Sequence, residues 1–357
     1  MESKQTNDLI IKWLWVGIIM VIFQIFLGGI TRLTGSGLSI THWDIITGVL
    51  YPFSEQQWNY YFDLYKQTPQ YLKINDKMDL SAFKFIFFWE YFHRLWARLM
   101  GFVFVLPLAY FLYKKWVPKF LYKNLIVIFL LAVFVASLGW IMVASGFVNH
   151  PWVNAYKLSF HLLAAVLLLC YLFVTILKLK DPVNIIDRPK IIDKSLGVLI
   201  ILVLLQILLG GVMAGMKASL IAPTWPTING NFFPPEIFRI SSYTQFLFSE
   251  YELSHTGPVI IQFFHRMCAY IIFILILILC IIFNRKYKNY SCRPIFYLIL
   301  LCFFQIVLGV LTLVNSVGYI PVWSGSLHQI GGIILLLYLL KLYFSFQLQY
   351  KSKNLKL

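Results

Sequence analysis

Eight long apolar runs limit the folds that this sequence can adopt more than any other feature. They lie near residues 12–31, 93–113, 123–144, 156–177, 195–216, 260–283, 294–314 and 327–346. Crossing about 30 Å of hydrocarbon takes about 20 helical residues, and an open strand would leave its backbone groups unpaired in lipid. A chain with 60% hydrophobic and only 12% charged residues is also unlike a soluble domain. The sequence therefore predicts an all-α integral membrane protein with eight transmembrane helices.

Lysine and arginine are concentrated on one side of this predicted bundle. They cluster in residues 1–12, 114–123, 178–194 and 285–293 and in the C-terminal tail, whereas most acidic residues fall in loops of the opposite side. Because positive residues mark the cytoplasmic side of a membrane protein, we expect both termini in the cytoplasm. The formal charge of +16 then belongs mostly to a rim that faces anionic lipid headgroups, and it implies no nucleic-acid partner.

The chain also repeats itself. Residues 24–52 align with residues 206–234, and with small loop corrections the alignment continues. Matched residues are Gln24 with Gln206, Gly28 and Gly29 with Gly210 and Gly211, Trp43 with Trp225, His93 with His265, Gly139 with Gly309, and His161 with His328. Since four spans return a chain to its starting side, the two copies run parallel. We expect two tandem four-helix bundles, residues 1–180 and 181–357, related by a pseudo-twofold axis along the membrane normal.

The first outer loop, residues 33–85, contains a predicted helix. Ser54 and Gln57 have capping-box spacing, and one helical face then carries four aromatic residues, Trp58, Tyr61, Phe62 and Tyr65. Two interpretations are open: a helix lying in the membrane interface, or a helix packed on the bundle. Further on, Ser81 is predicted to cap a helix that runs unbroken to Tyr113.

Four histidines lie within the spans. His93, His161, His265 and His328 all sit near the outer end of a helix that starts on the outer side, so they share one depth. Helices two and four of a four-helix bundle are diagonal partners, so each half opposes two imidazoles, as in a bis-histidine haem clamp. The alternatives are a buried histidine bonded to a serine or carbonyl, and a zinc site, which would need three or four clustered ligands.

Arginines accompany the histidines. Arg94 and Arg98 are one turn apart, Arg266 repeats Arg94, and Arg32 lies at the outer end of the first helix. Guanidinium groups at this depth are suited to bidentate pairing with haem propionates. The other interpretation is that they extend to the membrane interface.

The two histidine motifs differ at one informative position. "EYFHRL" at 90–95 has Glu90 where "QFFHRM" at 262–267 has Gln262. A carboxylate beside a haem edge can move protons or stabilise positive charge on a substrate carbon, which an amide cannot do. The sequence therefore predicts that the first half is the reactive one, with Glu90 as its catalytic residue. The alternative is a salt bridge from Glu90 to Arg94, four residues on.

These motifs, together with "GGITRLTGSGLSITHWDIITGVLYPFSE", "GWIMVASG", "YKLSFHL" and "TWPTINGNFFPP", resemble the haem A synthase family over nearly the whole chain, in its bacterial form. The resemblance implies oxidation of the C8 methyl group of haem O to the formyl group of haem A. It implies a haem b cofactor on His265 and His328, with Arg266 nearby. It also implies that the substrate haem O lies at His93 and His161, with Arg94, Arg98 and Arg32.

The resemblance further implies a setting and partners. These are a multi-pass protein of the bacterial plasma (inner) membrane with haem sites towards the periplasm, haem O supplied by a haem O synthase, cytochrome c oxidase assembly factors and an electron acceptor. The chain departs from the family at two places: its first outer loop has no cysteine pair, and helix three has Val135 where helix seven has Gln305.

Two other function classes fit parts of the pattern. A non-enzymatic b-type electron carrier would explain the repeats and histidine pairs, but not Glu90 or the family motifs. A transporter would explain the repeated halves. Against a transporter, the paired glycines lie towards the outer ends of their helices, where close helix packing explains them better.

Overall fold

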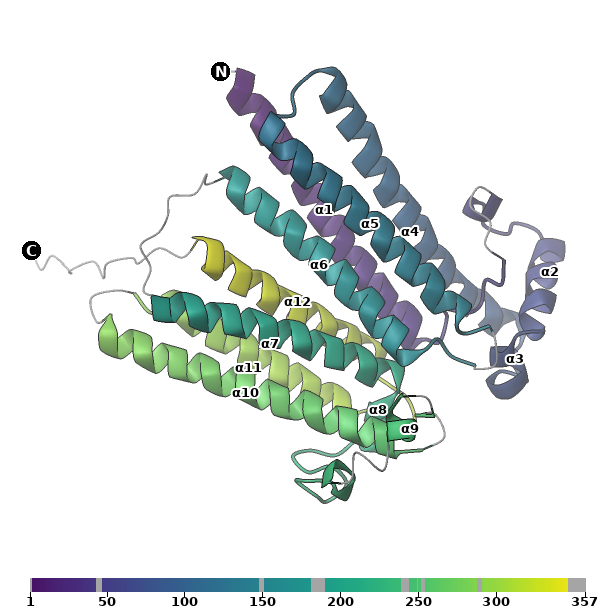
Figure 1. The fold of residues 1–357 in the computed structure, drawn as a ribbon. Helices are drawn as coiled ribbons and strands as arrows, with labels where there is room; N and C mark the ends of the chain where they lie inside the picture. The colour runs from purple at the N-terminus through teal and green to yellow at the C-terminus, as the bar shows by residue number, and fades with distance from the viewer. Residues whose placement is uncertain are drawn as a thin grey trace, which may run out of the picture.

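The computed structural model describes residues 2–42, 47–147, 151–180, 190–238, 244–248, 250–251, 254–287 and 291–345. Within them, eight helices are long and apolar enough to cross a membrane. These are α1 Glu2–Leu33, α4 Leu80–Tyr113, α5 Lys119–Ala144, α6 Ala155–Lys180, α7 Lys190–Gly215, α10 Thr256–Lys286, α11 Arg293–Val314 and α12 Val322–Ser345 (Figure 1). Each predicted apolar run falls on one of these helices, so the prediction of eight membrane-spanning helices is confirmed.

The short elements gather at one end of the bundle, which we call the loop end (Figure 1). They are the 3-10 turn η1 Thr47–Val49 and the helices α2 Glu55–Lys66, α3 Pro69–Ile74, α8 Ala218–Ile221 and α9 Thr244–Phe248. The start of α1 and the end of α12 lie at the opposite end. Both ends of the described chain are therefore on one side, as an even number of spans requires. Which side faces the cytoplasm stays a prediction.

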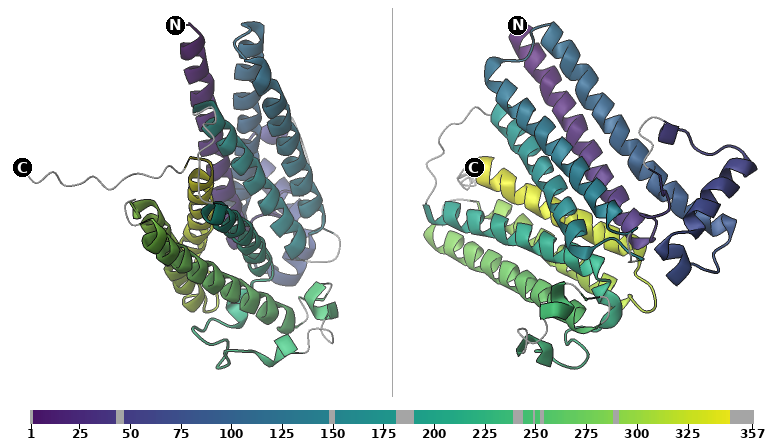
Figure 2. Two further views of the ribbon diagram at one scale, coloured as in Figure 1. Left: turned by 60° about the vertical axis from the view of Figure 1, so that its left-hand side comes forward. Right: turned by 45° about the vertical axis from the view of Figure 1, so that its right-hand side comes forward.

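Four helices make the middle of the molecule. α1 and α7 each pack against both α6 and α12, and α6 also contacts α12. The other four flank them: α4 packs on α1, α5 on α6, α10 on α7 and α11 on α12 (Figure 2). This arrangement leaves α4 diagonal to α6, and α10 diagonal to α12. The histidine-bearing helices of each half thus face each other without packing directly together.

Glycines allow the closest approaches between the two halves. A Cβ on Gly29 of α1 would clash with the Gln329 side chain of α12 and lie 3.5 Å from the Ser326 hydroxyl, and one on Gly211 of α7 would lie 2.7 Å from the Ser159 hydroxyl of α6. Gly29 aligns with Gly211, and Ser159 with Ser326, so the same pair of positions meets twice, more closely at Gly211 than at Gly29. Halves related by a twofold axis would make such reciprocal contacts. The axis itself, and the boundary near residue 180, stay predictions, and Trp43 lies outside the described residues.

The helix predicted in the first outer loop is α2, and it packs on the bundle. The Ser54–Gln57 capping box is present. Trp58, Phe62 and Tyr65 are buried against Phe83, Ile86 and Phe87 of α4. Of the two interpretations left open by the sequence, the structure therefore favours packing on the protein over lying in the membrane interface.

Helix α4 begins before the predicted cap. It starts at Leu80, and the Asp79 carboxylate accepts a hydrogen bond from the amide of Ala82 at 2.8 Å. The prediction of Ser81 as the cap is wrong, because Asp79 is also a strong capping residue and lies where the chain leaves extended backbone. The unbroken run to Tyr113 is confirmed, and it carries the first turns of α4 out to meet α2.

Candidate haem sites

In the second half, two histidine rings lie close together. His265 of α10 and His328 of α12 face each other with ring centres 6.4 Å apart and ring planes at 75°. Two imidazoles whose nitrogens each lie about 2 Å from one metal ion have ring centres about 6 Å apart. The pair is therefore spaced to hold a single metal ion between two diagonal helices.

Each of the four histidine rings lies against a glycine of a neighbouring helix. A Cβ on that glycine would lie closer to the ring carbon Cε1 than the ordinary carbon–carbon contact distance of about 3.5 Å. The four contacts are Gly28 with His93 at 3.2 Å, Gly139 with His161 at 2.8 Å, Gly210 with His265 at 3.1 Å and Gly309 with His328 at 2.7 Å. His93 and His161 also lie close enough for their charges to interact. The first half thus repeats the histidine environment of the second.

The hydrogen bonds of His161 and His328 would suit them to bind a metal. His161 Nδ1 lies 3.0 Å from the carbonyl oxygen of Val135, and His328 Nδ1 lies 3.1 Å from that of Gln305. A histidine whose Nδ1–H is held by a carbonyl presents Nε2 as its metal-binding nitrogen. Because the contact is made by a main-chain carbonyl, Val135 can hold the His161 ring in the same way that Gln305 holds the His328 ring. Only Gln305 adds a side-chain bond, to the His328 carbonyl at 2.6 Å.

His93 and His265 each carry a ring nitrogen with no partner. Their Nε2 atoms contact the side-chain amides of Gln24 at 3.1 Å and Gln206 at 3.2 Å. Their Nδ1 atoms are buried without a hydrogen-bond partner. A buried ring nitrogen without a partner calls for an explanation, and a bound metal is one that suits a neutral imidazole. The residues present therefore fit a bis-histidine ligand group in each half.

Gln24 and Gln206 were not predicted as site residues. Two signals in the sequence point to them: they align with each other, and each lies one turn before the glycine that faces the same histidine. Their hydrogen bonds to His93 and His265 cross between helices, so helical periodicity alone does not show them.

The arginines predicted to bind propionates have protein partners in the structure. Arg94 donates to Glu90 at 2.5 Å and to the Ile40 carbonyl at 3.3 Å. Arg266 donates to the carbonyls of Thr224, Pro226 and Thr227 at 2.7 to 3.4 Å and to the side chain of Gln262 at 3.0 Å. Each of the two thus attaches a loop to a histidine-bearing helix.

Arg32 and Arg98 differ in their surroundings. Arg32 donates to the carbonyls of Ala214 at 3.0 Å and Gly215 at 2.7 Å, at the carboxyl end of α7 in the other half. Cations are favoured at that end of a helix. Arg98 is half-buried and lies within electrostatic range of Arg94 and Tyr91. For all four arginines, contact with a propionate stays a prediction.

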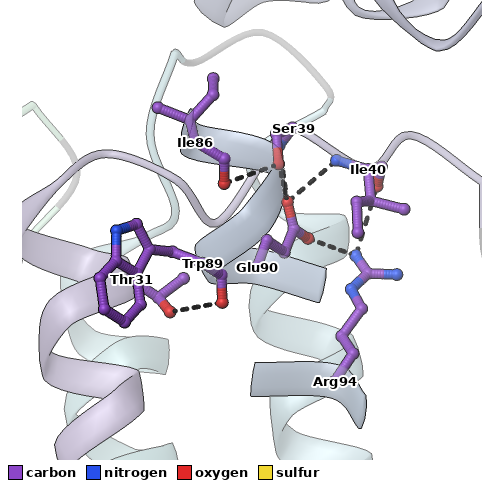
Figure 3. A network of polar contacts seen from close by, with 7 residues as sticks. All are labelled: Thr31, Ser39, Ile40, Ile86, Trp89, Glu90 and Arg94. Atoms are coloured by element: carbon purple, nitrogen blue, oxygen red, sulfur yellow. Dashed lines mark hydrogen bonds and ion pairs between the residues drawn. The ribbon is translucent and has the colours of Figure 1, made fainter. Parts of the chain in front are cut away.

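Glu90 is buried in a network of donors (Figure 3). Its side chain is only 3% exposed. One carboxylate oxygen accepts from the Ser39 amide at 2.7 Å, the Ser39 hydroxyl at 2.7 Å and the Ile40 amide at 2.9 Å, and the other accepts from Arg94. The alternative salt bridge to Arg94 is therefore present. Glu90 also fixes the loop after α1 against α4.

Gln262 occupies the matching position in the second half, but there the nearby backbone presents carbonyl oxygens instead of N–H groups. Its amide nitrogen donates to the carbonyls of Ala218 and Ala222, both at 3.2 Å, and its oxygen accepts from Arg266. Where the first half offers N–H groups the second offers carbonyls, so the first suits a carboxylate and the second an amide. The Glu90-to-Gln262 exchange thus has a structural cause, whatever its part in the chemistry.

Fold and site together define a helical membrane protein with eight candidate membrane-spanning helices in the described part of the chain, in which each half places one histidine on each of two diagonal helices. A family model described as "Cytochrome oxidase assembly protein" (COX15-CtaA) matches residues 11–340. The chain belongs to this family.

Named relatives cover almost the whole chain. It is 38% identical over 328 residues to the "Heme A synthase" of Pelagibacter ubique (strain HTCC1062), covering 91% of this chain and 92% of the relative. It is 38% identical over 345 residues to the "Heme A synthase" of Rickettsia felis, covering 95% and 98%. The family resemblance seen in the sequence motifs is confirmed.

Proposed function

We propose that this protein is a haem A synthase, which oxidises the C8 methyl group of haem O to the formyl group of haem A. The observation that carries the proposal is the pair of histidines in each half, each ring lying against a glycine, in a chain whose relatives over nearly its whole length bear that name. A carrier of electrons alone would explain the histidines but not the family.

The two halves have different parts in this proposal. His265 and His328 would hold a haem b, whose chemistry is one-electron transfer to an acceptor outside the chain. His93 and His161 would ligate the substrate haem O. The asymmetry that supports this assignment is the buried carboxylate of Glu90 in the first half, where the second has an amide.

Glu90 would act through a fixed negative charge. Both of its oxygens are held by donors, an arrangement that stabilises an anion and needs no reorganisation as charge develops nearby. Two successive two-electron oxidations, each adding the oxygen of one water molecule and releasing two protons, would convert the methyl group into a gem-diol, which loses water to leave the aldehyde. The four electrons removed would pass to the acceptor outside the chain. Positive charge that develops on the methyl carbon during oxidation is what such a carboxylate would stabilise.

The test is pigment extraction from the protein produced in cells that make haem O but no haem A. We expect haem A or the hydroxylated intermediate, identified by mass spectrometry, together with haem B. His93→Ala is the matched control and should abolish the new pigment without removing haem B. If the wild type yields haem B alone, the protein is an electron carrier and the proposal fails.

A further inference from the structure

The two halves differ in how closely their flanking helices pack together. α10 and α11 pack together, whereas the backbones of their counterparts α4 and α5 approach each other far less. On α10 the inward-facing Cys268, Ile272 and Ile276 are 7%, 2% and 0% exposed. In the register that pairs His93 with His265, their counterparts on α4 are Trp96, Met100 and Phe104, and all three are only half-buried. The interior of the first half is therefore open between α4 and α5.

Small residues line this opening. Gly101 of α4 and Ala132 and Ala136 of α5 are exposed, and a Cβ on Gly101 would meet nothing within 4 Å. We call these three residues the α4–α5 seam. At the matching positions the second half has larger side chains that fill the space: Phe273, Cys302 and Ile306, which are buried or pack on the core.

The seam begins at the histidine site. Gly101 lies about 12 Å along α4 from His93, at 1.5 Å per residue. Ala136 lies one turn before Gly139, the glycine beneath the His161 ring. The surrounding surface is apolar, with Phe102 63% and Phe129 48% exposed. A linear hydrocarbon attached to a haem at His93 and His161 could therefore run from the site into the seam and on into the bilayer.

We propose that the α4–α5 seam binds the isoprenoid side chain of the substrate haem. This rests on the proposed function: haem O carries a long hydrocarbon chain on the porphyrin edge, and haem B carries none. The half assigned to the tailed haem has the open seam, and the half assigned to haem b has it filled. Glycine and alanine present small apolar surfaces that leave room beside them, which suits a hydrocarbon chain.

The experiment replaces residues of the seam by the larger residues found at the matching positions of the second half. Ala136→Ile and Gly101→Phe are made separately, so that failure of one to fold leaves the other. The full-length protein is purified from cells without haem O, with retention of haem B in the second half as the check on folding. Each variant is then titrated at its first site with haem O and with haem B, followed by absorbance.

We expect the variants to bind haem O about tenfold or more weakly and haem B within about threefold of wild type, because only hydrocarbon contacts are lost. Ile126→Phe is the control, because it also places on α5 the residue found at the matching position of α11, Phe296. Ile126 is 58% exposed and Phe296 is 52% exposed, so the change fills no space between helices. It should change neither affinity.

Three results would overturn the proposal. Equal loss of haem O and haem B would mean that the porphyrin site itself was closed. Unchanged haem O binding would mean that the tail lies elsewhere. Unchanged binding with an altered oligomeric state would make the seam a contact between copies of the chain. Because binding is measured without turnover, these results are distinct from a wild type that makes no haem A.

Discussion

At the scale of single residues, the exchange of Glu90 for Gln262 follows the polarity of the backbone that each one meets. Ser39 and Ile40 present N–H groups to Glu90, while Ala218 and Ala222 present carbonyls to Gln262. Leaving a buried donor or acceptor without a partner costs about 1–3 kcal/mol, and more for a charged group. Each side chain is therefore matched to its own half.

Glu90→Gln separates the two roles of this carboxylate. We expect haem A formation to fall at least about tenfold, because a fixed charge worth more than about 1.4 kcal/mol in the transition state is lost. Protease cleavage within residues 36–42 reports whether the loop has come free. Loss of activity with an unchanged loop assigns the effect to charge, and loss of both assigns it to loop attachment. Full activity with an intact loop would contradict both roles.

Gln262→Glu is the reciprocal change. It places a carboxylate against the carbonyl oxygens of Ala218 and Ala222, so we expect a lower thermal midpoint and weaker retention of haem B. Ser39→Ala, which removes one hydroxyl donor in the first half and leaves the amides in place, is the mild comparison and should leave haem B unchanged. A Gln262→Glu protein as stable as wild type would show that backbone polarity does not select the amide.

The glycines beneath the histidines make a second prediction at this scale. Gly309→Ala would put a Cβ 2.7 Å from the His328 ring, so the ring must move off its carbonyl anchor. We expect loss of most haem B from the second half, measured by haem-to-protein ratio. Gly17→Ala in α1 meets nothing within 4 Å and should keep its haem. Equal haem content in the two variants would refute the ring-seating role.

At the scale of elements, α2 and α3 form a small cap on α4 that is centred on Tyr65. Its hydroxyl donates to Gln70 at 3.0 Å and accepts from Asn75 at 2.7 Å, and its side chain is 0% exposed. Burial raises the pKa of Tyr65 to about 12 from an ordinary value of 10.0. The neutral hydroxyl is therefore the form that the folded cap favours.

Tyr65→Phe should lower the free energy of unfolding by about 1–3 kcal/mol, because Gln70 and Asn75 lose a buried partner. The advantage of wild type is full below about pH 10 and declines towards about pH 12, since the folded state then holds a proton that the unfolded state has lost. Thermal midpoints of the two proteins across this range provide the measurement. Tyr60→Phe, at a position 59% exposed, should show no such change.

Elements were more predictable than the contacts between them. Hydropathy located all eight membrane-spanning helices because a run of about 20 apolar residues has few other uses. The amphipathic face of α2 was readable from its period, but its packing on Phe83, Ile86 and Phe87 was not, because a membrane surface and a protein surface select the same residues. The salt bridge from Glu90 to Arg94 was readable from its four-residue spacing. The main-chain carbonyls that Arg32, Arg94 and Arg266 also contact were not, because no side chain in the sequence marks where those carbonyls lie.

At the scale of the whole molecule, the two halves meet through close backbone contacts. A Cβ on Gly215 of α7 would lie 2.5 Å from the Cα of Ala155 at the start of α6, and a backbone atom cannot rotate away. Beside it, Arg32 bonds the Ala214 and Gly215 carbonyls across the interface. We expect the stability of the joined halves to depend on these contacts.

Gly215→Ala should therefore lower the free energy of unfolding by about 1–3 kcal/mol through overpacking, seen as a lower thermal midpoint in detergent. Gly197→Ala lies in the same helix but its Cβ would make an ordinary contact of 3.9 Å with Tyr343, so it should be neutral or stabilising. If the two variants have the same midpoint, α6 and α7 are not as closely joined as the structure has them.

The central claim is that one chain holds two haems for two purposes, and haem identity and stoichiometry test it most directly. Purified wild type is compared with the double variants His93→Ala/His161→Ala and His265→Ala/His328→Ala. We predict that the first variant keeps its haem B and forms no haem A, and that the second loses haem B. Loss of haem B from both variants alike, or haem A formed by the first, would contradict the account.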